Sequence, residues 1–189
     1  LSTAIRNTAL GQTTMAYLTS GDHNTAVGSE ANQNITTGSE NIAIGRASGY
    51  RNVAGSGNIA IGNESLYYGP TLVGKVEVGE YRNIAVGHKA MENGLYQRFN
   101  TSVGYGSLQG QFGAAGATGS TAIGYGANSA NTTGDYNTTL GYQAGDNITT
   151  GDYNISIGPD ADPPSATADY QMNIGGIIFG NDEYTDSAI

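Results

Sequence analysis

The chain of 189 residues contains no cysteine, no tryptophan and only four prolines. The lack of cysteine excludes a disulfide scaffold, a thiol nucleophile and cysteine-ligated metal sites. Long apolar runs are also missing: none approaches the roughly 20 residues that span a bilayer, and no basic-then-apolar leader opens the chain. What the sequence has instead is glycine, at 30 positions, and tyrosine, at 13. This composition differs from that of an ordinary mixed globular domain.

Positive charge is absent from the second half of the chain. All seven Lys and Arg lie within residues 1–98, together with seven acidic residues, whereas residues 99–189 contain nine acidic residues and no Lys or Arg. A surface of that sign repels phosphate backbones, so we expect no nucleic-acid partner, and the hydropathy predicts no membrane insertion. Because the chain begins at Leu1 rather than Met, we expect a fragment or a processed form of a longer protein.

A five-residue motif recurs through most of the chain. It consists of Asn or Ser, a β-branched residue, a small residue, a large aliphatic residue and Gly. The units are Asn7–Gly11, Asn24–Gly28, Asn41–Gly45, Asn58–Gly62, Asn83–Gly87, Asn100–Gly104, Ser120–Gly124, Asn137–Gly141 and Asn154–Gly158. Their starts are separated by 17, 17, 17, 25, 17, 20, 17 and 17 residues. A short, nearly constant period indicates a solenoid, in which each unit stacks on its neighbours.

Each unit has the pattern of a short strand followed by a corner. Period-two alternation of β-branched, small and aliphatic residues predicts a strand with one bulky and one small face. The Gly at the end of the unit predicts a tight corner with positive φ or a close backbone approach. A second extended stretch, such as "NITTG" at 147–151, predicts a second strand. Two strands and two corners would then form one flattened coil.

Asn and Tyr recur at equivalent positions and should stack from coil to coil. At a spacing of about 4.8 Å, the Asn that begins each strand lies over the next one, which predicts a structural amide ladder. Two sets of tyrosines follow the same logic, and we interpret them as stabilising ladders rather than a ligand platform. The sets are Tyr105, Tyr125 and Tyr142 after the corner Gly, and Tyr136, Tyr153 and Tyr170 before the next unit.

A single coil of this size encloses little. One large aliphatic and one β-branched residue per strand make a thin core, so something else should cover the other strand face. We expect the always-small position to lie against that neighbour. The simplest neighbour is another copy of the chain around a symmetry axis, so the sequence predicts a homotrimer.

Two insertions, near 63–82 and 105–119, interrupt the period. Insertions in a repeat scaffold form loops, and mixed aromatic and charged side chains suit recognition of carbohydrate or protein surfaces. With the segment 96–99, they supply the candidate ligand-binding residues Tyr67, Tyr68, Lys75, Glu77, Tyr81, Arg82, Tyr96, Arg98, Phe99 and Phe112. The alternative is that these loops cover the roll or a neighbouring subunit.

Catalytic and metal chemistry are not indicated. His23 and His88 have no companion at ligand spacing, and no GxSxG motif occurs, so we expect a non-enzymatic protein without cofactor or metal. The acid pairs Glu77/Glu80 and Asp160/Asp162 keep a polysaccharide-degrading spike open as an alternative. The oxygen ligands of Asp160, Asp162 and Asp169 suit Ca²⁺, but the segment 158–169 lacks Gly-rich calcium spacing and is interpreted as a cap. Interrupted Thr pairs such as Thr149–Thr150 do not favour an ice-binding face.

The motif resembles that of two families. The "N-[TI]-A-[IV]-G" strand with its Gly corner resembles the head repeats of trimeric autotransporter adhesins, and "NTTLGYQAGDNITTGDYN" resembles repeats of bacteriophage tail fibres and fibre-like adhesins. The resemblance covers residues 7–170. It implies an all-β, left-handed parallel β-roll of about nine 17-residue coils, assembled as a homotrimer. The segment "YQMNIGGIIFGND" at 170–182 resembles the strands that precede an endosialidase-type intramolecular chaperone.

We therefore expect a β-roll repeat domain over 1–170 and capping strands over 171–189, which would lead to a chaperone domain not contained in this chain. The resemblance implies an extracellular, trimeric fibre-tip adhesin of a virion tail fibre or a bacterial surface fibre. Its partner would be a cell-surface glycan or an outer-membrane receptor. The alternatives are a structural shaft or spacer with its binding tip elsewhere, and a polysaccharide-degrading tailspike.

Overall fold

The computed structural model describes residues 3–67, 82–93, 97–110 and 117–179. Within these residues, eleven strands form a single sheet in which neighbours in space are also neighbours in sequence. They are β1 (Thr8–Leu10), β2 (Thr25–Val27), β3 (Ile42–Ile44), β4 (Ile59–Ile61), β5 (Ile84–Val86), β6 (Thr101–Val103), β7 (Thr121–Ile123), β8 (Thr138–Leu140), β9 (Ile155–Ile157), β10 (Met172–Ile174) and β11 (Ile177–Phe179). The described part of the chain has no helix of the length and hydropathy needed to cross a bilayer.

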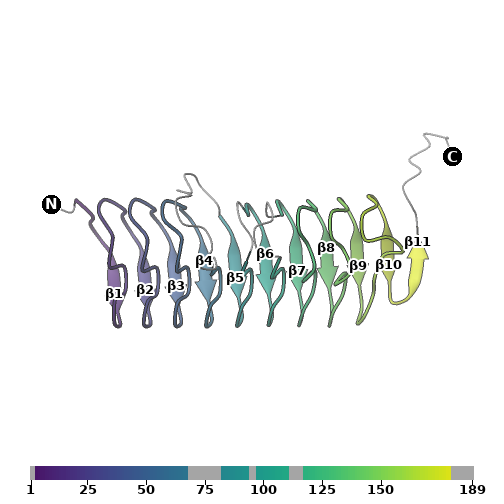
Figure 1. The fold of residues 1–189 in the computed structure, drawn as a ribbon, viewed down its shortest axis with the longest axis horizontal. Helices are drawn as coiled ribbons and strands as arrows, with labels where there is room; N and C mark the ends of the chain where they lie inside the picture. The colour runs from purple at the N-terminus through teal and green to yellow at the C-terminus, as the bar shows by residue number, and fades with distance from the viewer. Residues whose placement is uncertain (1–2, 68–81, 94–96, 111–116, 180–189) are drawn as a thin grey trace.

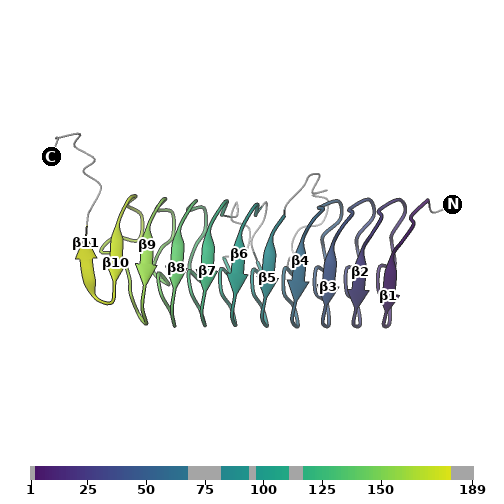
Figure 2. The same cartoon turned by 180° about the vertical axis from the view of Figure 1, so that it is seen from behind.

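The first ten strands are parallel and in register, as in the pairing of Ala26 with Ala43. Each connection returns the chain to the same side, so the strands lie side by side along an elongated column, with β1 and β11 at its opposite ends (Figures 1 and 2). The expected all-β solenoid is therefore confirmed, while the left hand of the coil stays a prediction. The strand β11 pairs antiparallel with β10 and ends the sheet.

The repeat continues through both insertions. Ile59 pairs with Ile84 although 25 residues separate them, and Thr101 pairs with Thr121 across 20 residues. A tenth parallel strand, β10, follows Gln171. Because Gln171 stands where the other units have Asn or Ser, the five-residue motif did not identify this strand as a repeat unit. The inserted residues are thus accommodated without a shift in strand register.

The strands turn their small residues inward. The central residues of β2 to β10, such as Ala43 and Ala85, are buried, whereas Leu10 is 67% exposed and Ile44 is 40% exposed. This corrects our expectation that the large aliphatic side chains fill the coil and that the small ones face a neighbour. The reason is that the connecting segments already supply the bulk of the interior. Their large buried side chains are Met15, Ile35, Leu66, Met91, Leu108 and Ile148.

The corner glycines behave as expected. Gly45 has a φ of 127°, and a Cβ at this position would lie 2.5 Å from the carbonyl oxygen of Gly62 in the next coil. Both the backbone conformation and the stacking distance therefore require glycine.

The second extended stretch is not a strand. Residues 34–38 and 147–151 form turns and bends, so the prediction of two strands per coil is wrong for the described residues. These segments still bond from coil to coil, as in the 2.8 Å hydrogen bond from the N–H of Thr36 to the carbonyl of Val53. Single bonds of this kind replace a ladder because the chain turns too sharply to keep successive residues extended.

The amide ladder is confirmed. The Oδ1 of Asn24 accepts the backbone N–H of Asn41 at 3.0 Å, and the Nδ2 of Asn24 donates to the carbonyl of Gly38 at 2.9 Å. Ser120 continues the ladder through its Oγ, which accepts the N–H of Asn137 at 3.1 Å. These buried side chains satisfy backbone groups that no strand partner reaches.

Candidate interaction surface

The first and third residues of strands β1 to β10 point outward and form what we call the outer sheet face. It runs the whole length of the column and consists mainly of Ile, Val, Leu and Thr. Its exposed aliphatic residues are Leu10, Ile42, Ile44, Ile84, Ile123, Leu140 and Ile174. A continuous apolar stripe of this kind is unusual on an isolated soluble protein and is typical of an interaction surface.

Two columns of side chains border the strands at their two ends. The leading column consists of the residue before each ladder position: Arg6, His23, Glu40, Gly57, Arg82, Phe99, Gly119, Tyr136, Tyr153 and Tyr170. These residues share a left-handed backbone, with φ between 43° and 69°. The trailing column consists of the residue after each corner Gly: Gln12, Ser29, Arg46, Asn63, His88, Tyr105, Tyr125, Tyr142 and Pro159.

Aromatic rings stack along both columns, as expected. In the leading column, Tyr153 stacks on Tyr136 and Tyr170 with ring centroids 5.0 Å apart in each pair. In the trailing column, Tyr125 stacks on Tyr105 at 5.1 Å and on Tyr142 at 5.4 Å. These rings remain about half exposed, because only their faces are covered. Each ladder therefore stiffens the column and leaves ring edges available for contact.

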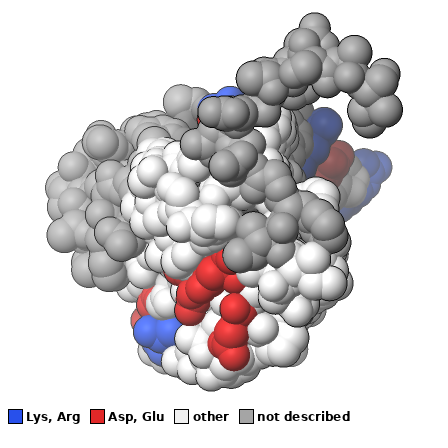
Figure 3. All heavy atoms as spheres, turned by 90° about the vertical axis from the view of Figure 1, so that its right-hand side faces the viewer, with Lys and Arg blue, Asp and Glu red and all other residues white. Residues whose placement is uncertain are grey.

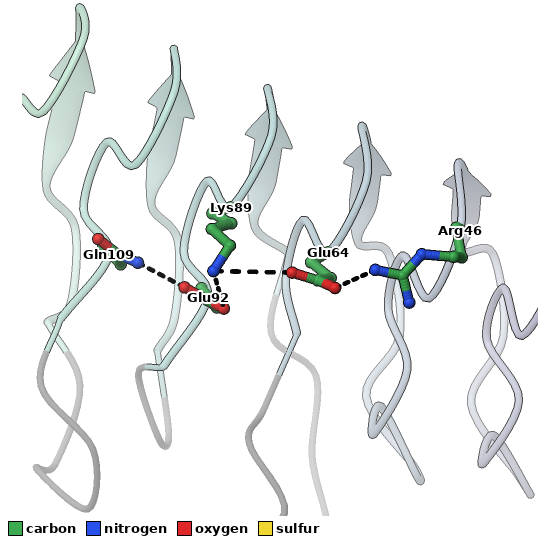
Figure 4. A network of polar contacts seen from close by, with 5 residues as sticks. All are labelled: Arg46, Glu64, Lys89, Glu92 and Gln109. Carbon is green, nitrogen blue, oxygen red and sulfur yellow. Dashed lines mark hydrogen bonds and ion pairs between the residues drawn. The ribbon is translucent and has the colours of Figure 1, made fainter.

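A charged network crosses the middle of the column (Figure 4). Arg46 pairs with Glu64, and the Nζ of Lys89 lies 3.7 Å from Oε2 of Glu64 and 3.0 Å from Oε1 of Glu92. Gln109 donates to Glu92 from the following coil. The hydrogen bond to Glu92 is the main cause that raises the pKa of Lys89. Single exposed pairs stabilise little, so the network chiefly sets the order of charges along the surface.

An aspartate column lies beside the tyrosines of the leading column. The Oδ1 atoms of Asp135, Asp152 and Asp169 accept the backbone N–H of Thr118, Asp135 and Asp152, each at 2.7 Å. Burial raises the pKa of Asp135, and the charge of Asp152 adds to the effect, against the hydrogen bond from Thr118. Seen from the C-terminal end, acidic side chains stand out on a described surface that is otherwise mostly uncharged (Figure 3).

Four of the candidate ligand-binding residues lie within the described residues. The ring of Tyr67 contacts that of Tyr50 with centroids 5.3 Å apart, and burial raises the pKa of Tyr67. Arg82 and Phe99 occupy neighbouring coils of the leading column, where Phe99 is 56% exposed. Arg98 forms an isolated parallel bridge with Thr118. Arg82, Arg98 and Phe99 are therefore parts of the repeat framework rather than of a separate loop.

The other candidates, Tyr68, Lys75, Glu77, Tyr81, Tyr96 and Phe112, lie outside the described residues. The outer sheet face was not predicted as a surface, because the large aliphatic residues were expected in the interior. The signal was nevertheless present, since an aliphatic residue recurs at the fourth position of every unit.

The residues considered for Ca²⁺ are not gathered into one site. Among the described residues, no group of three His, Cys, Asp or Glu is placed to hold a metal ion. Asp169 belongs to the aspartate column, whereas Asp162 faces Asp146. Burial and then the charge of Asp146 raise the pKa of Asp162.

The fold and surface define an all-β repeat protein, a β-solenoid with one apolar outer face. Comparisons with protein-family models, with curated proteins and with solved structures found no match to this chain.

Proposed function

We propose that the chain is a non-enzymatic segment of an extracellular fibre that assembles as a homotrimer and attaches to a ligand on a cell surface. The outer sheet face is the observation that carries the proposal. Parallel sheets in proteins are almost always covered on both faces. Here one face packs inside the coil, and the other exposes aliphatic side chains along the whole column.

Other copies of this chain suit the outer sheet face. Fully burying an exposed Ile or Leu contributes about 1.5–3 kcal/mol, and a side chain such as Ile44, which is 40% exposed, contributes the corresponding fraction. Summed over many coils, the stripe still favours association. A copy running in the same direction has the same coil spacing and can match the stripe at every coil. Closed rotational symmetry then covers the outer sheet face of every copy and leaves none free to add further copies. We propose three copies, each a left-handed roll, as the resemblance to the two families implies.

The adhesive part of the proposal rests on the two insertions. They add residues between β4 and β5 and between β6 and β7 while strand register is kept. Loops that vary on a regular scaffold are the usual place for recognition. We propose that their ligand is a glycan or an outer-membrane component, reached from a phage tail fibre or from a bacterial surface fibre.

A structural spacer is the second candidate, and a specific contact favours it. Tyr67, the first aromatic residue of the longer insertion, packs on Tyr50 of the preceding coil. The tyrosine ladders likewise use aromatic side chains for stacking. A stiff column of this kind suits a shaft whose binding tip lies elsewhere in the fibre.

Light scattering on the purified chain tests the assembly, with a trimer expected and a monomer contradicting it. A glycan and cell-envelope binding screen tests adhesion. The parent is compared with a variant in which eight residues of the longer insertion are removed, restoring a 17-residue coil. Binding by the parent that the trimeric variant loses supports the adhesin. Equal binding by both would place the ligand site outside the longer insertion, whereas binding by neither supports the spacer.

A further inference from the structure

We infer that, in the assembly, the leading column of one chain packs against the trailing column of its neighbour at the same coil level. This inference rests on the proposed trimer and adds which residues meet across the subunit boundary. It identifies the partner of each column as the opposite column of a second copy.

The two columns lie at opposite margins of the outer sheet face. Glu40 comes two residues before β3, and Arg46 comes two residues after it. Six residue steps, including the strand β3 and the corner at Gly45, separate them, which places their Cα atoms at most about 20 Å apart at opposite ends of the strand. The two columns of one chain are therefore too far apart to touch each other. A contact between a leading and a trailing column must involve two different chains.

Rotational symmetry decides which margins meet. In a ring of three copies every contact is heterologous, so the leading margin of one chain faces the trailing margin of the next. A two-fold axis perpendicular to the column would instead place like margins together and run the columns in opposite directions. The side chains of the columns discriminate between these arrangements.

The columns are chemically matched in the coils of β3, β6 and β8. In the coil of β3, Glu40 of the leading column would face Arg46 of the trailing column, an acid opposite a base. The coils of β6 and β8 pair aromatic residues with aromatic residues, namely Phe99 with Tyr105 and Tyr136 with Tyr142.

The coil of β7 combines a small with a large residue. It has Gly119 in the leading column and Tyr125 in the trailing column. The ring of Tyr136 from the next coil lies over Gly119, because a Cβ there would be 2.6 Å from a ring carbon. The leading column thus presents an aromatic surface in the coil of β7 as well, although Gly119 itself has no side chain.

Glu40 and Arg46 are available for this contact. The Arg46 side chain is 55% exposed, and its pairing with Glu64 leaves guanidinium donors for a second carboxylate. Glu40 is exposed, and among the described residues it has no ion-pair partner in its own chain. The aromatic ladders, half exposed at their ring edges, offer the edge contacts that aromatic pairs favour.

Cysteine cross-linking tests the pairing directly, because the chain has no cysteine of its own. The full chain is prepared with the double substitution Glu40→Cys and Arg46→Cys, with each single substitution, and with a mismatched pair, Glu40→Cys and Gln12→Cys. Gln12 lies in the trailing column two coils away. Each protein is first sized by light scattering and then treated with a short bismaleimide.

The expected result is a trimer by light scattering for every variant. Only the matched pair should then lose its monomer band on a denaturing gel and give a covalent trimer. A trimer in which the single or mismatched variants cross-link equally, or in which nothing cross-links, would overturn the column pairing alone. A monomer by light scattering would overturn the proposed assembly as well. Circular dichroism verifies that each variant keeps its strands.

Discussion

The side-chain oxygen of Asn41 accepts the backbone N–H of Asn58 at 3.0 Å, one coil further along the column. Its amide nitrogen donates to the carbonyl of Gly55 at 2.9 Å. One buried side chain therefore satisfies two backbone groups of the next coil, which is why the repeat begins with Asn.

Replacing this ladder residue should destabilise the fold. Asn41→Ala leaves the buried N–H of Asn58 without an acceptor, while the carbonyl of Gly55 keeps the donor of Asn52, so we expect a loss of about 1–3 kcal/mol in the free energy of unfolding. Urea unfolding at constant protein concentration measures it. Asn34→Ala is the control, because Asn34 is only partly buried and makes one coil-to-coil bond. Equal losses for both variants would contradict the role of the ladder.

Larger side chains on the inward face of the strands should destabilise the fold. Ala85 is fully buried, so Ala85→Leu overfills the interior and should cost about 1–3 kcal/mol or more. Val86→Leu, one residue further and on the outer sheet face, should keep the fold of the coil. Thermal unfolding followed by circular dichroism compares the two. A lower melting temperature for Val86→Leu than for Ala85→Leu would mean that Val86, and not Ala85, faces the interior of the coil.

The corner glycine should be the least replaceable position. Gly45→Ala combines a φ of 127° with a Cβ only 2.5 Å from a backbone oxygen, so we expect a larger loss of stability than for Asn41→Ala. Gly175→Ala is the matched control, since Gly175 has a φ of 59° and no atom within 4 Å of the added Cβ. Only the left-handed backbone is then penalised, at about 1–2 kcal/mol. Melting temperatures measured for the two variants should differ clearly, and similar values would argue against close coil stacking.

The aspartate column should make stability depend on pH. The pKa of Asp135 is raised above its ordinary value of 3.8, so the folded state holds the proton more tightly than the unfolded state. Stability therefore falls as pH rises from 3.8 through the raised pKa. Asp135→Asn keeps the acceptor for Thr118 without the charge.

We expect Asp135→Asn to raise the melting temperature at pH 7 and to match the parent below pH 3.8, where the aspartate is neutral in both states. Thermal unfolding between pH 3 and 8 measures the difference. A variant less stable than the parent at pH 7 would show that the charge itself strengthens the hydrogen bond by more than burial and Asp152 oppose it.

Removing a central tyrosine should weaken the stack. Tyr153 contacts rings on both sides, and aromatic pairs are worth about 0.5–1.5 kcal/mol each, so Tyr153→Ala should cost about 1–3 kcal/mol. Tyr17→Ala is the control, because Tyr17 is exposed and has no ring partner among the described residues. Urea unfolding compares the two variants. Equal, small losses of stability in both variants would show that ring stacking contributes little to the stability of the fold.

The sequence by itself determined the repeat, its register and its ladders. Asn41, Gly45 and Tyr153 each have equivalent residues 17 positions away. Stacking one coil on the next brings these equivalent residues together regardless of the conformation of the rest of the coil. The solenoid, the amide ladder, the corners and the ring stacks all follow from this period, because they depend only on which residues share a level.

The tertiary structure alone decided which strand face lies inside. Alternation distinguishes two faces but does not orient them, and both faces here carry apolar residues. The orientation depends on the width of the interior, which Leu66, Met91 and Leu108 fill from the connecting segments, leaving space only for residues such as Ala85 on the strand. The large aliphatic side chains are therefore left on the outer sheet face, where they form the surface on which the proposed assembly depends.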